Sequence, residues 1–448
     1  MKSNSRLMKA IAAVCVIPSM VGFAACGSSG DSKGETDSQG NVELNVWAWE
    51  ATLTDATKKF EAKYPNIKVK LRNVGSGNKH YIALDNAIQA GSGAPDVTQM
   101  EYLALAQYAI NKHLVDITDR TSGFDKFYTP GTWNAVQWGG KTYGLPMDSG
   151  PMAFFYNKDV FDKSGVDPTS IKTWDDYYQA AKKIRATGSY ITSEEGDGGF
   201  FEAMSWAAGG KPYKTSQDGS EIKVNLTADP GVKTYVDFWQ KMVSEDLVDT
   251  KTPNWSDEWF RSMTDDSIAS LLIGAWMPTN MVNSAPAGAG KWRVATLPTP
   301  DGSKKSSEYG GSSLAILSSS KKVDAAYKYI EFINHDKEGI KSRVDGGAFP
   351  SDEATLESQK FLESTKIKNS KGEEVDYFGG QQINKVFAES AKNVSTDWQF
   401  LPFEEYARGK FKDYISKVYS NGSPFSKEMA NYQKDLTTYA DRQGFKVK

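Results

Sequence analysis

Tryptophan residues stand beside carboxylates at the ends of predicted strands. Trp47, Trp49 and Glu50 close the first strand expected in the chain, and Trp276 follows a strand-end Gly-Ala pair that lets its ring leave the core. A tryptophan ring can stack on the apolar face of a sugar, while carboxylates and amides bind the hydroxyl groups at its rim. The chain also has 12 Trp, 21 Tyr and 21 Phe, more stacking surface than an average core requires. We therefore predict a binding site for a neutral sugar.

Other chemistries have less support in these residues. Glycoside hydrolysis needs two placed carboxylates, and the acidic pairs Glu194-Glu195 and Glu404-Glu405 are interpreted as solvated faces. The chain has no His-Glu-x-x-His motif and no phosphate-binding loop. Its three histidines and two cysteines predict no metal centre and no cofactor. With 53 Lys and Arg against 56 Asp and Glu there is no basic excess, so no nucleic-acid partner is expected.

Residues 1–25 have the pattern of a secretory signal peptide. Cationic residues begin the chain, the apolar stretch Leu7–Phe23 follows, and two alanines lead to Cys26. The small residues before this cysteine resemble a bacterial lipobox, which predicts that Cys26 carries lipid. Residues 26–41 then form a flexible tether, because they are too polar to bury a core. The alternative is an ordinary signal peptide with an incidental cysteine.

Strands and helices alternate from Val42 onward. The periodicity predicts strand Val42–Trp47, helix Leu53–Tyr64, strand Ile67–Val74, helix Tyr81–Ala90 and strand Asp96–Met100. This order argues for a parallel sheet covered by helices. Later elements are a helix that begins at a capping box of Thr173 and Asp176, a helix over 230–243, a strand over Ser267–Ile273, and helices marked by Ala326–Ile333 and Phe411–Val418.

A series of segments carries a family resemblance. The segments are Leu44–Glu50, Phe60–Ile67, Gly91–Val97, Tyr143–Ser149, Phe155–Asp159, Trp174–Tyr177, Ser270–Trp276 and Gly310–Ile316. Each is weak alone, but in this order behind a lipobox-like cysteine they are specific. The chain resembles an extracellular solute-binding lipoprotein of an ABC importer, in the carbohydrate-binding family related to maltose-binding protein. The resemblance covers nearly all of residues 42–448.

The resemblance implies an α/β fold of two lobes, each a mainly parallel sheet flanked by helices, with a hinge between them. One lobe would hold residues 42–148 and 308–346, and the other 149–307 and 347–448. A ligand in the cleft would favour closure only if it contacted both lobes. The implied partners are an oligosaccharide and the transmembrane subunits of an ABC permease. The protein would be a monomer, anchored through Cys26 to the extracellular face of the cell membrane of a Gram-positive bacterium.

The resemblance also selects site residues. Trp276 matches the position of the family's stacking aromatic residue. Asp148 matches the position of a carboxylate that accepts hydrogen bonds from sugar hydroxyls, and Trp49 and Glu50 match the positions of the family's first ligand contacts. A core tryptophan is the structural alternative for Trp276, and a helix or hinge cap is the alternative for Asp148. Trp47 belongs to the same set but faces the other side of its strand, where it could pack inside.

Weaker signals complete the predicted site. They are Glu101 and Tyr102 at the end of the third strand, Trp206 and Trp398 in segments where the family tends to carry aromatics, Trp255, Asn78, and Gly311 with Ser312 as backbone donors. Core packing is an equal alternative for Trp206 and Trp398, and a simple turn is the alternative for Gly310-Gly311.

The predicted function is therefore that of a non-enzymatic binding component that delivers an oligosaccharide to a permease. A sugar of two or more units is favoured, because several aromatic platforms would be redundant for one ring. A surface-anchored glycan-degrading enzyme is one alternative. A binding protein for a peptide, polyol or charged small molecule is another.

Overall fold

A five-stranded sheet is built mainly from the first part of the chain. The computed structural model describes residues 40–448, so the predicted signal peptide, Cys26 and nearly all of the tether lie outside the described residues. The strand order is β2 (Ile67–Arg72), β1 (Val42–Trp47), β3 (Val97–Glu101), β14 (Ser312–Ile316) and β6 (Gly144–Pro146). β1 is parallel to β2 and β3, which confirms the predicted parallel start. β14 is antiparallel to both β3 and β6.

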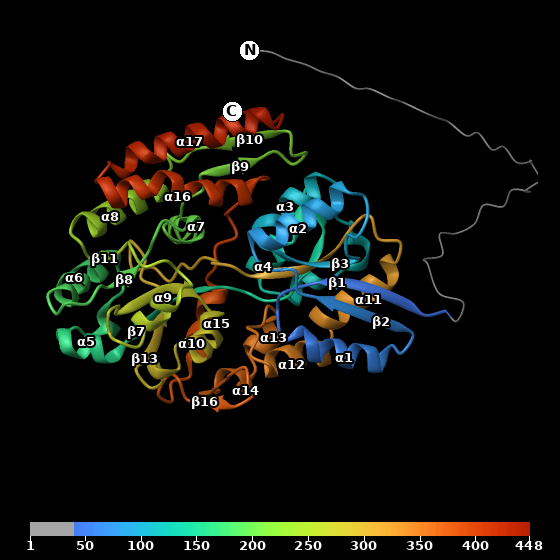
Figure 1. Ribbon diagram of the computed structural model, residues 1–448, viewed down its shortest axis with the longest axis horizontal. Helices are drawn as coiled ribbons and strands as arrows, with labels where there is room; N and C mark the ends of the chain where they lie inside the picture. The colour runs from blue at the N-terminus through green and yellow to red at the C-terminus, as the bar shows by residue number, and fades with distance from the viewer. Residues whose placement is uncertain (1–39) are drawn as a thin grey trace, which may run out of the picture. The chain divides into compact units, whose positions relative to one another are not determined.

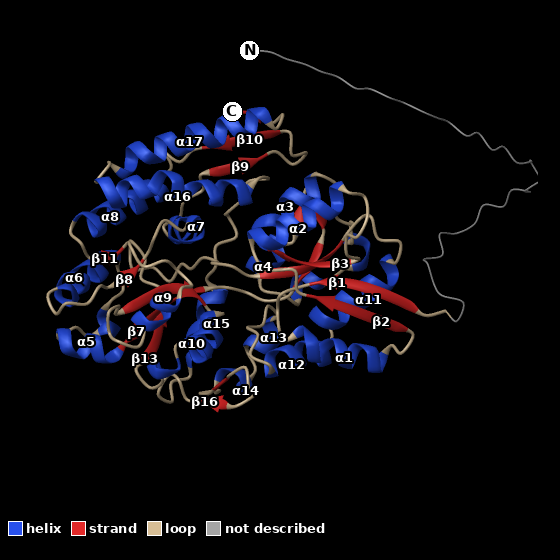
Figure 2. Cartoon of the chain, in the orientation of Figure 1, coloured by secondary structure: helices blue, strands red, loops and turns tan. Residues whose placement is uncertain are grey.

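Helices cover both faces of this sheet (Figures 1 and 2). They are α1 (Leu53–Lys63), α2 (Asn78–Gln89), α3 (Tyr102–Ile110), α11 (Val323–Asn334) and α12 (Lys337–Asp345). Leu44 and Val46 pack in one hydrophobic cluster with residues of α1 and α11, whereas Trp47 packs in a second cluster with residues of α2 and α3. Successive strand residues face opposite sides, so this one strand contributes to both cores.

A second sheet differs from the predicted pairing. It has the order β12 (Ser270–Gly274), β7 (Met152–Asn157) and β13 (Trp292–Thr296), and both pairs are antiparallel. The prediction of a mainly parallel sheet in each lobe is therefore wrong here. The apolar runs of β7 and β12 are typical of parallel strands because these are usually buried on both faces. In this sheet helices bury both faces although the strands are antiparallel.

The second sheet also separates two hydrophobic clusters. Phe154 packs in a cluster with α6 and α7, while its neighbour Phe155 packs in another with α10 and α15. The helices of this part are α5 (Lys158–Ser164), α6 (Trp174–Arg185), α7 (Gly198–Ala207), α8 (Pro230–Ser244), α9 (Asp257–Ser262), α10 (Met277–Ser284), α15 (Ile383–Lys392), α16 (Glu404–Asn421) and α17 (Phe425–Arg442). The capping box predicted at Thr173 and Asp176 is present at the start of α6.

Shorter elements complete the described chain. They are the helices α4 (Pro130–Ala135), α13 (Glu353–Leu356) and α14 (Gln359–Leu362), and the strand pairs β4 (Gln137–Trp138) with β5 (Lys141–Thr142), β8 (Thr192–Ser193) with β11 (Val248–Asp249), and β15 (Ile367–Lys368) with β16 (Glu374–Val375). A last small sheet contains β9 (Tyr213–Thr215), β10 (Glu221–Val224) and β17 (Lys446–Val447). Within residues 40–448, no helix combines the length and apolar character that a membrane crossing requires.

Two antiparallel segments connect the sheets. Residues 146–152 lead from β6 to β7, and residues 307–313 lead into β14; we call them the crossing segments. They are joined by hydrogen bonds from Met152 N to Ser307 O at 2.9 Å and from Tyr309 N to Gly150 O at 2.8 Å. The site described next is built around these segments.

Candidate functional site

Two of the predicted tryptophans form one aromatic surface. The rings of Trp255 and Trp276 stack with centroids 5.5 Å apart and an angle of 27° between their planes. Trp255 is 51% exposed, and Trp276 is half-buried at the start of α10. We call this pair the tryptophan platform. Large exposed aromatic side chains are candidates for ligand contact, because core packing does not account for their position.

Three glycines hold Trp276 in place. Its Nε1 donates a hydrogen bond to the carbonyl oxygen of Tyr309 at 2.6 Å. A Cβ atom added at Gly150, Gly274 or Gly310 would lie 3.1, 2.4 or 2.8 Å from that nitrogen. Side chains at these three positions would therefore push the indole away from the crossing segments. Gly310 also has a φ of +92°, which a residue with a Cβ rarely adopts.

The loop after β1 carries Trp49 and Glu50. Both backbone N–H groups donate to Oε1 of Gln99 at 3.0 Å, and Gln99 Nε2 donates to Ser312 Oγ at 3.0 Å. The loop is thereby tied to β3 and β14. The Trp49 ring lies edge-on to the buried His80 ring at 4.9 Å, and His80 in turn forms a hydrogen bond with Thr98. Trp49 and Glu50 remain half-buried, so their side chains keep some access to solvent.

Asp148 lies on the first crossing segment next to Ser312. Its Oδ1 accepts hydrogen bonds from Ser312 N at 2.5 Å and from Ser312 Oγ at 2.9 Å. The pKa of the Asp148 carboxyl is raised to about 7, chiefly by burial and also by the charge of Glu50, against the opposing charge of Arg343. The Ser312 N–H is therefore committed to Asp148, which differs from the expectation that it faces a ligand. Gly311 instead gives room to the Tyr102 ring, which would lie 2.7 Å from an added Cβ.

Glu101 ends β3 and Tyr102 begins α3 directly after it. Tyr81 Oη donates to Glu101 Oε2 at 3.2 Å and accepts the Glu101 N–H at 2.9 Å. Burial raises the pKa of the Glu101 carboxyl, and the charge of Arg408 opposes that rise. Tyr102 is buried, and its hydroxyl donates to the carbonyl oxygen of Asp148 at 2.6 Å. Glu101 thus keeps a half-buried carboxylate near the site, whereas Tyr102 supports the crossing segment.

Sequence reasoning missed three residues beside the platform. The Tyr309 ring lies edge-on to Trp276 at 6.1 Å, and its hydroxyl donates to Asp197 Oδ2. Arg408 donates to Glu202 Oε2 through Nε and Nη2, at 2.8 and 2.5 Å. An aspartate directly before the helix-opening Gly198 is a recognisable N-cap, and Asp197 has this position at the start of α7. No local pattern marks Tyr309 or Arg408.

Two acidic residues interpreted as part of solvated faces are buried instead. Glu194 is 2% exposed, and its carboxylate accepts hydrogen bonds from the N–H groups of Gly196 and Asp197 and from the Tyr419 hydroxyl. Burial raises the pKa of Glu194 to about 7. Glu404 is completely buried and accepts the Leu401 N–H at 2.7 Å. These carboxylates close loops, a task that adjacency in the sequence does not reveal.

Four predicted site residues lie elsewhere. Trp47 is buried in the core, as its alternate-face position allowed, and Asn78 is exposed at the start of α2. Trp206 and Trp398 are buried and stack on each other at 5.6 Å with an angle of 13°. Together with Tyr102 they line a cavity of about 330 Å³ that contains no residue of the platform. The predicted aromatic residues therefore divide into two groups.

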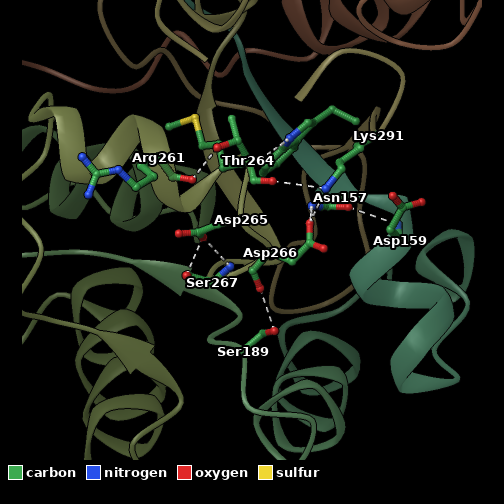
Figure 3. Close-up of polar contacts among 11 residues, drawn as sticks. Asn157, Asp159, Ser189, Arg261, Thr264, Asp265, Asp266, Ser267 and Lys291 are labelled. Atoms are coloured by element: carbon green, nitrogen blue, oxygen red, sulfur yellow. Dashed lines mark hydrogen bonds and ion pairs between the residues drawn. The ribbon is translucent and has the colours of Figure 1, made fainter. Parts of the chain in front are cut away.

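Two other features fall outside the candidate site. A cavity of about 630 Å³ lies beside α10 and α12 and has five lysines in its wall, but none of the predicted site residues. Figure 3 shows a polar network in which Asp266 Oδ1 accepts hydrogen bonds from Asn157 Nδ2 at 2.9 Å and Lys291 Nζ at 3.0 Å. Asn157 ends β7 and Lys291 precedes β13, so this network fixes strand ends. Among the described residues, no group of three His, Cys, Asp or Glu could hold a metal ion.

A buried carboxyl group joins the crossing segments. Glu308 Oε1 accepts the Ser149 hydroxyl at 2.8 Å, and Oε2 accepts the Gly150 N–H at 2.6 Å. Burial raises the pKa of Glu308 to about 8, against these two hydrogen bonds, and the charge of Asp148 adds to the rise. The crossing segments therefore enclose a carboxyl group that favours its protonated form near neutral pH.

Comparisons with known proteins bear on the fold and the family of the chain. Residues 48–339 match a family model described as bacterial extracellular solute-binding protein. The chain is similar to the ABC transporter associated binding protein from B. animalis subsp. lactis Bl-04, which was solved in complex with beta-1,6-galactobiose. The two sequences are 57% identical, and the structures match with a TM-score of 0.83 over 91% of this chain and 100% of that one. The galacto-N-biose-/lacto-N-biose I-binding protein from Bifidobacterium longum, in complex with lacto-N-biose, matches at 26% identity and TM-score 0.77, covering 92% and 100%. A lactose-binding protein from Rhizobium radiobacter is 26% identical over 78% of this chain and 81% of its own. These structures confirm the predicted α/β fold class.

The Glu308 carboxyl predicts a pH-dependent stability. Because its folded-state pKa is about 8 against a usual 4.5, the folded protein binds more protons than the unfolded chain between these values. The free energy of unfolding should then fall as pH rises from 5 to 8. Glu308→Gln should show a smaller fall, since glutamine imitates the protonated side chain. Thermal unfolding at pH 5 and pH 8 measures this, with exposed Glu374→Gln as the control. Equal falls in the wild type and Glu308→Gln would contradict the assignment.

Proposed function

The chain belongs to the family of bacterial extracellular solute-binding proteins and is a non-enzymatic, oligosaccharide-binding component of an ABC transporter, and we propose that its ligand is a galactose-containing disaccharide or short oligosaccharide. The exposed tryptophan platform is the observation that carries the proposal. Support for galactose comes from the 57% identical B. animalis protein, which was solved with beta-1,6-galactobiose. The Rhizobium lactose-binding protein points to the same sugar class.

The platform and the acidic groups suit different parts of such a sugar. One face of a galactose ring is lined by C–H groups and can stack on Trp276 or Trp255. Its hydroxyl groups can donate to the carboxylates of Glu50 and Asp197 and accept from Arg408. We propose that Trp49 contacts the second sugar unit from the loop after β1. A disaccharide would then span both sets of side chains around the crossing segments.

We further propose that the chain forms two lobes with boundaries at 42–148 and 308–346, and at 149–307 and 347–448. The hydrophobic clusters support this division. The two clusters around the five-stranded sheet have their buried members within residues 44–147 and 314–333. Those around β7 have theirs within residues 152–297 and 349–440. Trp49 belongs to the first part and the platform to the second, so a sugar contacting both would favour closure of the lobes.

Calorimetric titration tests the ligand class. We expect beta-1,6-galactobiose to bind most tightly among four sugars, with lactose weaker and maltose and cellobiose weakest, because the last two lack galactose. Incubation with the same sugars should release no new reducing ends, since binding needs no bond cleavage. If maltose binds as tightly as galactobiose, the galactose assignment is wrong. Release of reducing ends would favour the glycan-degrading alternative.

Truncation of the platform tests the stacking role. Trp276→Ala should weaken beta-1,6-galactobiose binding roughly 30- to 1,000-fold, as expected for a buried aromatic anchor. Trp133→Ala, which removes a ring stacked on Tyr128 at 5.8 Å in α4, is the matched control and should leave affinity unchanged. If Trp276 were instead a core residue, its loss would cost about 3–5 kcal/mol of stability. An early-melting variant with normal affinity would assign it to the core.

We also propose that the extracellular protein is held at the membrane by lipid on Cys26, and that it passes its ligand as a monomer to the transmembrane subunits of an ABC permease. The sequence pattern before Cys26 supports the anchor. Cys26→Ser should release the protein from cells into the medium, measured by immunoblotting of cell and medium fractions. Cys15→Ser, within the predicted signal peptide, should leave the protein with the cells. Equal retention of the two variants would remove the support for a lipid anchor.

A further inference from the structure

Trp255 has a backbone conformation that its bulky side chain does not favour. Its φ is +67°, in the left-handed region that residues with a large side chain rarely adopt. Within residues 40–448 it forms no hydrogen bond of its own, and half of its side chain remains exposed although the ring contacts Trp259 and Trp276. A strained conformation persists only where its surroundings impose it. A neighbouring group must therefore hold this part of the chain in place.

Glu195 binds the residue directly before Trp255. Its Oε1 accepts the Asn254 N–H at 3.1 Å, and its Oε2 accepts a hydrogen bond from Lys412 Nζ at 2.5 Å. Among the described residues, no other side chain bonds to the backbone of Asn254 or Trp255. The Glu195 carboxylate therefore links α16, which carries Lys412, to the segment that presents the exposed ring of the platform.

The loop that carries Glu195 is itself fastened to a buried group. The carboxylate of the preceding Glu194 accepts the N–H groups of Gly196 and Asp197, at 2.7 and 2.5 Å. It also accepts the hydroxyl of Tyr419 on α16. These contacts close the loop over a buried carboxylate on both sides of Glu195, so its side chain extends from a fixed backbone.

We propose that Glu195 is a positioning residue, which holds the Trp255 ring against Trp276. Asp197 in the same loop accepts the hydroxyl of Tyr309, whose ring lies edge-on to Trp276. One loop thereby positions both aromatic neighbours of Trp276. A ring that is already held in place loses less side-chain freedom when a ligand binds, which raises the affinity. This last step rests on the sugar-binding function proposed above, whereas the hold on Trp255 does not.

Fluorine NMR of the ligand-free protein labelled with 5-fluorotryptophan tests the hold on Trp255, with Trp255→Phe to assign its signal. Glu195→Met keeps a similar length without a carboxylate. It should move the Trp255 signal and enlarge its shift between light and heavy water, because the ring becomes more exposed. Glu195→Gln should restore the signal, since its amide oxygen still accepts the Asn254 N–H. Glu221→Met, which also removes a lysine-paired carboxylate, is the matched control and should leave the signal unchanged.

A double-mutant cycle tests whether Glu195 acts on the ligand through Trp255. Calorimetry with beta-1,6-galactobiose supplies the affinities. Glu195→Met should weaken binding roughly 2- to 10-fold, because the released ring must be ordered when the sugar binds. In a Trp255→Ala background the same change should leave the affinity unaltered. A merely structural role would weaken binding equally in both backgrounds.

The proposal is overturned if Glu195→Met leaves the Trp255 signal of the ligand-free protein where it is, or if Glu195→Gln moves that signal as far. It is also overturned if Glu195→Met weakens galactobiose binding equally with and without the Trp255 ring. If Trp255→Ala itself leaves the affinity unchanged, the proposed sugar contact of Trp255 is wrong. The ligand-free signal then still decides the role of Glu195.

Discussion

The hydrogen bond from the Trp276 indole to the Tyr309 carbonyl is the constraint on which the candidate site depends. It holds the Trp276 indole nitrogen, two residues beyond the end of β12, 2.6 Å from a carbonyl oxygen of a crossing segment. The indole can come this close only because Gly150, Gly274 and Gly310 carry no Cβ atom, which would collide with it. With Trp276 held in this position, Trp255 stacks on it and the Tyr309 ring lies edge-on to it. One contact thereby positions three aromatic rings, and glycine placement rather than aromatic content limits where the platform can form.

Burial shifts several acidic groups in the crossing segments and elsewhere in the described chain. Removal from water raises the pKa of Asp148, Glu194 and Glu405 to about 7 and that of Glu308 to about 8. A carboxyl group that titrates near neutral pH can both donate and accept hydrogen bonds at modest cost. Asp148 and Glu308 use their hydrogen bonds on Ser312, Ser149 and Gly150, so their protonation bears on how the crossing segments are held together.

Local patterns in the sequence predicted the first helices and strands well. Contacts between segments that are distant in the sequence could not be predicted from such patterns. Thr173 with Asp176 marked the start of α6, because a capping box acts over a few residues. Trp47 was predicted as a site residue with core packing as its alternative, and the structure buries it in the core. The antiparallel pairing of β7 was missed because burial on both faces makes its composition resemble a parallel strand. Tyr309 and Asp197 are 112 residues apart, and no feature of either segment announces their contact.

The aromatic excess that first indicated sugar binding proves to have several origins. Trp239 and Trp292 are completely buried with their indole N–H groups bonded, and they serve the core. Trp255 is half exposed and lies against Trp276, a position that packing does not require. Trp398 is buried like the first pair, yet its N–H lacks a partner among the described residues. Like Trp47, Trp398 is buried, so exposure places both residues in the core. Exposure at the surface, rather than the number of aromatic residues, is therefore what singles out the platform as a candidate for ligand contact.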